Sequence, residues 1–205
     1  MRPGADAETA LPQGRWQLVH RIESLFPGNH KALMMGALVL DSETGHLTCA
    51  LMTVEGFTLF SAAWNDRLEV TRAVPPFDGP GFAEGLMADL RLLFFPPAPA
   101  RQEVGVTREG IVRRYRHTDG RVTDVLTLAR DRFRIDRYDA NARRLRRAAL
   151  NLAPLPSPGG RMAQEILLEA TGDAGYTLRL DLIEAVPQGS APQPPETGSM
   201  PKDAP

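Results

Sequence analysis

The chain has 205 residues, 42% of them hydrophobic and 24% charged, with 18 glycines, 18 prolines and one cysteine. This composition excludes collagen, a wholly disordered chain and a disulfide scaffold, and it predicts a domain that buries a core without a structural metal. The formal net charge is −1, yet residues 101–150 hold 14 arginines against 7 acidic residues, so one basic region is expected on a nearly neutral protein.

Both ends of the chain have compositions typical of disorder. Residues 1–13 are mostly small and polar, and residues 187–205 include six prolines among 19 residues. Segments of this kind bury too little apolar surface to offset the entropy lost on folding. We therefore expect a single domain over residues 14–186, with disordered segments on both sides.

The N-terminal part of this domain shows short apolar or alternating segments separated by turn residues, which predicts antiparallel β-structure. The expected strands are 16–22, 31–40, 46–53, 58–64 and 68–73. The connections between them are short and several carry glycine or aspartate, as hairpin turns do. These five strands are therefore expected to form a meander.

After residues 75 and 76, both proline, the spacing of the apolar residues changes from that of strands to that of a helix. Residues at helical spacing are Phe82, Leu86, Leu90 and Phe94. This spacing predicts one amphipathic helix over about residues 81–95. Pro96 and Pro97 end it, because proline has no amide hydrogen to donate and its ring clashes with the preceding turn.

The chain next returns to strand patterns. The expected strands are 110–117, 121–128, 133–138, 164–170 and 176–183, whereas residues 141–150 fit either a short helix or a strand. The predicted fold class is mainly β (α+β). It is a strongly curved antiparallel sheet, or half-barrel, of about ten strands, with the helix across its concave face. Such a sheet encloses a hollow that the helix or a ligand must fill.

The alternating apolar residues of the strands and the apolar face of the helix together predict an apolar ligand cavity in this hollow. The candidate residues are Met34, Leu38, Leu51, Phe60, Leu86, Leu90 and Phe94. Methionine adapts its shape to irregular apolar spaces, which suits such a cavity. Ordinary core packing of the same residues is the alternative interpretation.

The sequence predicts no catalytic residues, no metal site and no cofactor. The G-x-S-x-G pattern of serine hydrolases is absent, and the four histidines are too far apart for a helical zinc motif. The glycines of residues 79–85 imitate a dinucleotide loop but do not follow a strand. The lone Cys49 cannot form an intramolecular disulfide.

The basic region offers candidates for binding anionic groups. They are Arg132, Arg134, Arg143 and Arg144. On one face these side chains would attract phosphate head groups or an acidic protein. A solvated strand face with interleaved aspartates is the alternative. An isoelectric point near 6.4 and 6% aromatic residues argue against nucleic acid as a partner.

Residues 32–40 form the longest apolar run, and its nine residues are far fewer than the about 20 that a membrane-spanning helix requires. No transmembrane segment is therefore predicted. The first 30 residues also lack the apolar stretch of a secretory signal. The expected location is the periplasm or the periplasmic face of the outer membrane if a signal is missing, and the cytoplasm if the start is as written.

Several segments together resemble a known family. They are 36–41 (GALVLD), 45–48 (GHLT), 53–60 (TVEGFTLF), 87–96 (MADLRLLFFP) and 175–180 (GYTLRL). Their order resembles uncharacterised Gram-negative envelope lipoproteins encoded with aryl-polyene synthesis genes, which are similar to lipoprotein-localisation carriers and receptors of the LolA/LolB type. The resemblance implies a half-open β-barrel with a helical lid and a cavity for acyl chains.

The leading hypothesis is therefore non-enzymatic binding or carriage of a lipid, an acyl chain or another hydrophobic molecule in envelope lipid or lipoprotein handling. Another envelope protein is a further candidate partner. One alternative is a small enzyme on the same scaffold that acts on an aromatic or polyene intermediate, which cavity walls lined by Arg113, Tyr115 and Arg134 would favour. A second is a protein-binding scaffold that uses the arginine-rich face.

Overall fold

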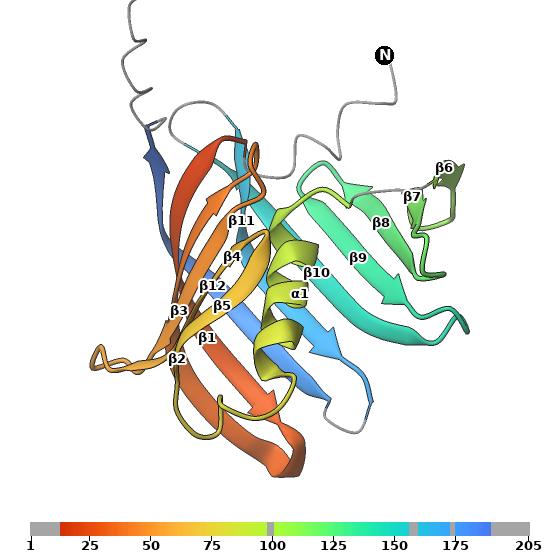
Figure 1. Ribbon diagram of the computed structural model, residues 1–205. Coiled ribbons are helices and arrows are strands. Elements are labelled where there is room, and N and C mark those ends of the chain that lie inside the picture. The colour runs from red at the N-terminus through yellow and green to blue at the C-terminus, as the bar shows by residue number, and fades with distance from the viewer. Residues whose placement is uncertain (1–12, 98–100, 156–159, 173–174, 190–205) are drawn as a thin grey trace, which may run out of the picture.

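The computed structural model describes residues 13–97, 101–155, 160–172 and 175–189. Within these residues twelve strands form a single antiparallel sheet, and one α-helix lies across its concave face (Figure 1). This confirms the predicted mainly β half-barrel. The sheet has more strands than the about ten expected from the sequence.

The sheet consists of two meanders. The first contains β1 (Arg15–Phe26), β2 (His30–Asp41), β3 (Leu47–Met52), β4 (Thr58–Asn65) and β5 (Arg67–Ala73). The second contains β6 (Arg101–Val106), β7 (Ile111–Arg116), β8 (Val122–Ala129), β9 (Arg132–Tyr138), β10 (Arg144–Pro154), β11 (Arg161–Ala170) and β12 (Tyr176–Gln188). β1 pairs with β12, so the strand order is β5-β4-β3-β2-β1-β12-β11-β10-β9-β8-β7-β6. The helix α1 (Phe82–Phe94) therefore connects the two edge strands across the whole sheet.

Alternation along the strands creates the concave core. In β1 every second residue is buried, and Leu18 and Ile22 lie opposite Leu38 and Met34 of β2. Directly opposite residues of an antiparallel pair point to the same face, so these side chains pack together on the concave side. Each fully buried side chain of this kind stabilises the fold by about 2 kcal/mol.

Residues 144–154 form a strand, which settles the helix-or-strand ambiguity of this segment. Ala148 and Leu150 alternate toward the core and lie opposite Ile135 and Phe133 of β9. The segment is a strand because its inward-facing apolar residues lie opposite inward-facing apolar residues of β9, and such cross-strand packing outweighs local propensity.

β6 was not predicted from the sequence. It is an edge strand with no fully buried residue, and its Val106 is 85% exposed. Hydrogen bonds to β7 hold it in place rather than an apolar face, so the period of two that marks a half-buried strand is missing. A backbone pairing of this kind leaves little trace in the sequence.

The predicted disordered ends lie almost entirely outside the described residues. At the C-terminal end β12 continues to Gln188, two residues beyond the expected domain limit of 186. Pro187 and Val186 are held there opposite Trp16 and Gln17 of β1.

α1 occupies residues 82–94, close to the predicted 81–95. It begins after Gly81, whose φ of 77° suits a residue without a Cβ, and it ends just before Pro96. The helix residues buried against the sheet are Met87, Asp89, Leu92, Leu93 and Phe94. No helix of the described segments is long and apolar enough to span a bilayer.

Candidate ligand cavity

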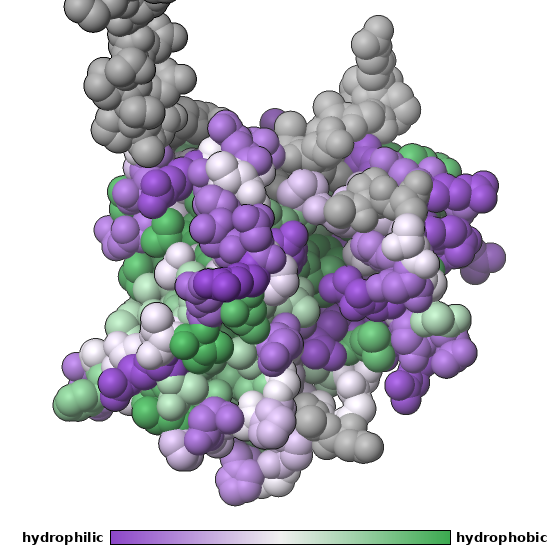
Figure 2. All heavy atoms as spheres, viewed as in Figure 1, coloured by the Kyte–Doolittle hydropathy of each residue, from purple (hydrophilic) through white to green (hydrophobic). Residues whose placement is uncertain are grey.

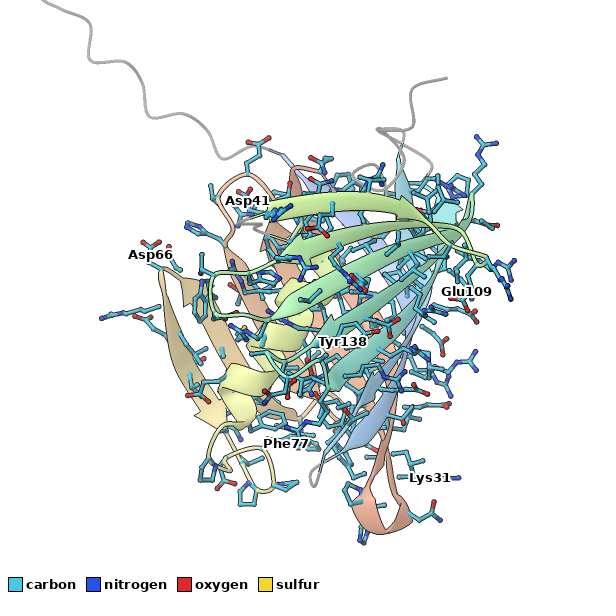
Figure 3. The ribbon with its side chains drawn as sticks, turned by 90° about the vertical axis from the view of Figure 1, so that its right-hand side faces the viewer. Lys31, Asp41, Asp66, Phe77, Glu109 and Tyr138 are labelled. Carbon is cyan, nitrogen blue, oxygen red and sulfur yellow. The ribbon has the colours of Figure 1, made fainter. Side chains whose placement is uncertain are left out.

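A cavity of about 460 Å³ lies between α1 and the concave face of the sheet. Its walls come from β1, β2, β3, β10, β11, β12, the helix and the loop that leads into the helix. Phe77, labelled in Figure 3, belongs to that loop. A volume of about 300–1,000 Å³ is typical of sites for small organic molecules.

Six of the seven predicted cavity residues line this space: Met34, Leu38, Leu51, Leu86, Leu90 and Phe94. The seventh, Phe60, is fully buried but does not line the cavity. Its ring packs at 5.2 Å on the ring of Phe82, which does line the cavity. Their role in ligand binding stays a prediction.

One whole wall of the cavity was not predicted from the sequence. Leu168 of β11 and both Leu178 and Leu180 of β12 line it opposite the helix. These strands reach the cavity because β12 pairs with β1, at the other end of the chain. Their own alternation was visible in the sequence, but no local signal places them beside β1.

Two glycines of the wall lie in regular secondary structure. A Cβ on Gly36 of β2 would lie 2.6 Å from the Cδ1 of Ile22, so this glycine makes room for the isoleucine. A Cβ on Gly85 of α1 would meet no atom within 4 Å. Glycine in a helix interior is less stable than alanine by about 1 kcal/mol. The helix thus keeps open space at Gly85 although a larger residue would stabilise it.

One polar cluster connects the helix to the sheet at the cavity wall. Asp89 of α1 is 5% exposed, and its Oδ1 accepts a hydrogen bond from the Arg146 Nε at 2.8 Å. Its Oδ2 accepts one from the Tyr176 hydroxyl. Burial, and then the Asp89 carboxylate, raise the pKa of Tyr176, so its phenol stays protonated. We call these three residues the Asp89 cluster; it attaches α1 to β10 and β12.

His20 is a further polar residue of the wall, outside the Asp89 cluster. It is 3% exposed, and its ring lies 5.7 Å from the ring of Phe94. Its Nε2 is buried and has no hydrogen-bond partner among the described residues. Burial lowers the pKa of His20 to about 4, against a weaker opposing effect of Asp181. The imidazole is therefore neutral at pH 7.

This burial predicts a pH-dependent stability. The unfolded chain protonates His20 near pH 6.5 and the folded one only near pH 4, so the free energy of unfolding should fall between these values by up to about 3 kcal/mol. His20→Leu should remove this part of the pH dependence. Urea unfolding of both proteins at pH 7 and pH 4 measures the difference, because the carboxyl groups contribute equally to both. Parallel pH profiles would contradict the prediction.

The four arginines predicted to bind anionic groups do not gather at the cavity. Arg132 is exposed, and Arg143 pairs with Asp139 at 3.2 Å in the β9–β10 turn. Arg134 forms ion pairs with Asp136 and Glu109. Arg144 has a buried Nε without a hydrogen-bond partner in the described part of the chain.

The outer face of β7 to β10 is instead a ladder of ion pairs. Asp136 is almost fully buried and accepts hydrogen bonds from the Nε atoms of Arg134, at 3.0 Å, and Arg147, at 2.7 Å. The buried Asp124 binds both ends of the Arg114 fork at 2.8 and 2.7 Å. Figure 2 shows hydrophilic residues gathered on the β6–β9 side of the molecule. Most of the positive charge there is already matched by carboxylates.

No group of three or more histidine, cysteine, aspartate or glutamate side chains within the described ranges could hold a metal ion. Cys49, on the cavity wall, is a free thiol, and burial raises its pKa to about 11. It is therefore a protonated, weakly reactive part of the wall at neutral pH.

A curved antiparallel sheet with a helix over an apolar cavity defines a half-barrel with an internal ligand-sized space. Among solved structures, the chain is similar to the LolA superfamily protein NE2245 from Nitrosomonas europaea, with a TM-score of 0.54 and 12% identity over 91% of each chain. A putative outer membrane lipoprotein-sorting protein domain from Vibrio parahaemolyticus shows a TM-score of 0.42 and 10% identity over 90% of this chain and 89% of that one. No protein-family profile and no curated protein matches the sequence. The chain thus has the LolA-like fold that its sequence pattern resembled.

Proposed function

We propose that this protein binds the apolar part of a lipid, or another long-chain hydrophobic molecule, in the cavity beneath α1. It holds this molecule without chemical conversion, and it acts in the handling of lipids or lipoproteins in the cell envelope. The residues that contact the ligand are the six lining residues given above, with Leu178 and Leu180 on the opposite wall.

The observation that carries this proposal is a large apolar space that the fold keeps open. Cavities lower stability by about 24 cal/mol for each Å³, because the side chains around them lose contacts. An alanine or larger residue at position 85 would reduce the space and strengthen the helix, yet the residue is glycine. A ligand that fills the cavity restores the missing van der Waals contacts. Ligand binding therefore explains why the fold retains this space.

In this proposal α1 covers the cavity and can be displaced from the sheet. Its contacts with the sheet are side-chain contacts, whereas neighbouring strands are joined by continuous ladders of hydrogen bonds. The Asp89 cluster supplies two polar bonds between helix and sheet. Displacing α1 would therefore open the cavity without breaking the sheet.

The test is a titration of the purified protein with N-phenyl-1-naphthylamine, a neutral fluorescent probe for apolar sites. We expect saturable binding of one probe per protein with a blue-shifted emission. Unlabelled long-chain lipids should displace the probe. Absence of saturable binding by delipidated, folded protein would contradict the proposal.

A further inference from the structure

A row of polar side chains crosses the concave face beside the apolar cavity. On β7 to β10, Tyr115 lies opposite Thr123, Thr123 opposite Arg137, and Arg137 opposite Arg146. Directly opposite residues share a face of the sheet. Arg146 points inward, because it contacts Asp89 of the helix and lines the cavity. The whole row therefore points inward, at the side where the cavity meets β10.

Arg137 is the member of this row whose charge is not matched. Its Nε is buried and has no hydrogen-bond partner within the residues that the structure describes. The two carboxylates that act on it electrostatically are already paired, Asp119 with Arg121 and Asp89 with Arg146. Burial, and then the neighbouring Arg121, lower the pKa of Arg137. An arginine nevertheless stays charged at neutral pH.

A partly buried guanidinium with an unused donor destabilises a fold unless an anion binds there. Arg137 is the next-to-last residue of β9; its neighbour Tyr138, the last residue of the strand, is labelled in Figure 3. On the outer face of the same strand, Arg134 has two carboxylate partners, Asp136 and Glu109. Arg144, opposite Tyr138 on the outer face, also has a buried Nε without a partner in the described ranges. Arg137 differs from it in lying on the inner face beside Arg146, which lines the cavity.

We propose that Arg137, with Arg146 beside it, binds the anionic head group of an amphiphile whose chain occupies the cavity. This inference rests on the proposed function and specifies its ligand class. The shared chemistry is an oxyanion, a carboxylate or a phosphate, which guanidinium groups bind through paired N–H donors. Arg146 lines the cavity, so a head group at this pair is continuous with a chain in the apolar space.

The inference is tested by displacement of N-phenyl-1-naphthylamine with ligands that share one chain. Oleic acid is compared with oleyl alcohol, and oleoyl lysophosphatidic acid with monooleoylglycerol. The wild-type protein should bind the anionic member of at least one pair about tenfold more tightly, as expected for a charge-assisted contact of about 1.4 kcal/mol. The pair that shows the larger preference distinguishes a fatty acid from a phosphate lipid.

Two variants locate the effect. Arg137→Met should abolish the preference for the anion while the neutral ligands keep their affinity. The matched control is Arg132→Met, which removes the same charge from the exposed outer face of the same strand and should keep the preference. Thermal unfolding of the ligand-free Arg137→Met protein should be unchanged or shifted upward, because this substitution breaks no hydrogen bond of Nε.

Equal affinities for acid and alcohol, and for phosphate and glyceride, would overturn the inference and leave the proposed function standing. So would an unchanged preference in Arg137→Met. A marked loss of stability in the ligand-free Arg137→Met protein would show that Arg137 has a structural partner, and this would also overturn it. Failure of all four amphiphiles and of the probe to bind would contradict the proposed function itself.

Discussion

Replacing Gly85 by tryptophan is expected to abolish the binding of apolar ligands. Gly85 lies in the interior of α1 and faces the cavity, and a Cβ there meets no atom within 4 Å. An indole at this position enters the space that the ligand would occupy. Titration with N-phenyl-1-naphthylamine should show a loss of affinity of about a hundredfold or more, which corresponds to about 3 kcal/mol of lost burial.

The stability of the same variant separates blocked binding from misfolding. Tryptophan and alanine are both better helix formers than glycine, so Gly85→Trp and Gly85→Ala should each unfold at a temperature no lower than the parent protein. Gly85→Ala adds one methyl group to a cavity of about 460 Å³ and should still bind the probe. Unchanged probe affinity in a folded Gly85→Trp protein would exclude this cavity as the binding site.

Replacing Asp89 by alanine is expected to lower the free energy of unfolding by about 3 kcal/mol. The substitution removes a carboxylate that accepts hydrogen bonds from Arg146 and Tyr176, and it leaves the partly buried Arg146 without this counter-ion. The loss should also loosen α1 and accelerate the release of a bound probe. Urea denaturation and stopped-flow fluorescence measure the two effects.

Two further proteins serve as controls for Asp89. Glu69→Ala removes a carboxylate whose ion pair with Arg67 lies in open solvent, so its stability should change little. The double variant Asp89→Leu/Arg146→Met replaces both charges by apolar side chains and should recover most of the loss, because neither charge of the pair is left without its partner. A double variant as unstable as Asp89→Ala would show that the ion pair is not the source of the effect.

The first meander and the helix were largely predictable from the sequence. Alternation in β1 and β2 and the period of Phe82, Leu86 and Leu90 are local patterns, and the structure has the corresponding elements. The Asp119–Gly120 turn was also predictable. Gly120 has a φ of 80°, and the amide of His117 donates to the carbonyl of Arg121 across the turn.

The parts that were missed depend on non-local contacts. β6 forms only as an edge strand along β7. Residues 141–150, for which the sequence left helix and strand open, are mostly in β10 because its apolar residues meet partners on β9. The pairing of β1 with β12 joins the two ends of the chain and adds the wall that Leu178 and Leu180 provide. Single-sequence periodicity carries no information on such partners.

The same distinction holds for the candidate site. Met34 and Leu38 could be assigned to the cavity because the side chains of one strand alternate between its faces. The arginines could be recognised as a basic region, but their partners could not. Arg134 faces outward onto Asp136, whereas Arg137, three residues later, faces inward beside Arg146. Only the register of β9 against β10 distinguishes these two environments.

Native mass spectrometry of gently purified protein, with organic extraction and lipid analysis of the same sample, shows whether the space beneath α1 holds a ligand. We expect a protein fraction with one bound amphiphile, whose mass is lost after delipidation and which is absent from the Gly85→Trp protein. A single ligand-free mass for the wild-type protein, unchanged after addition of long-chain lipids, would contradict the claim that the space beneath α1 is a ligand site.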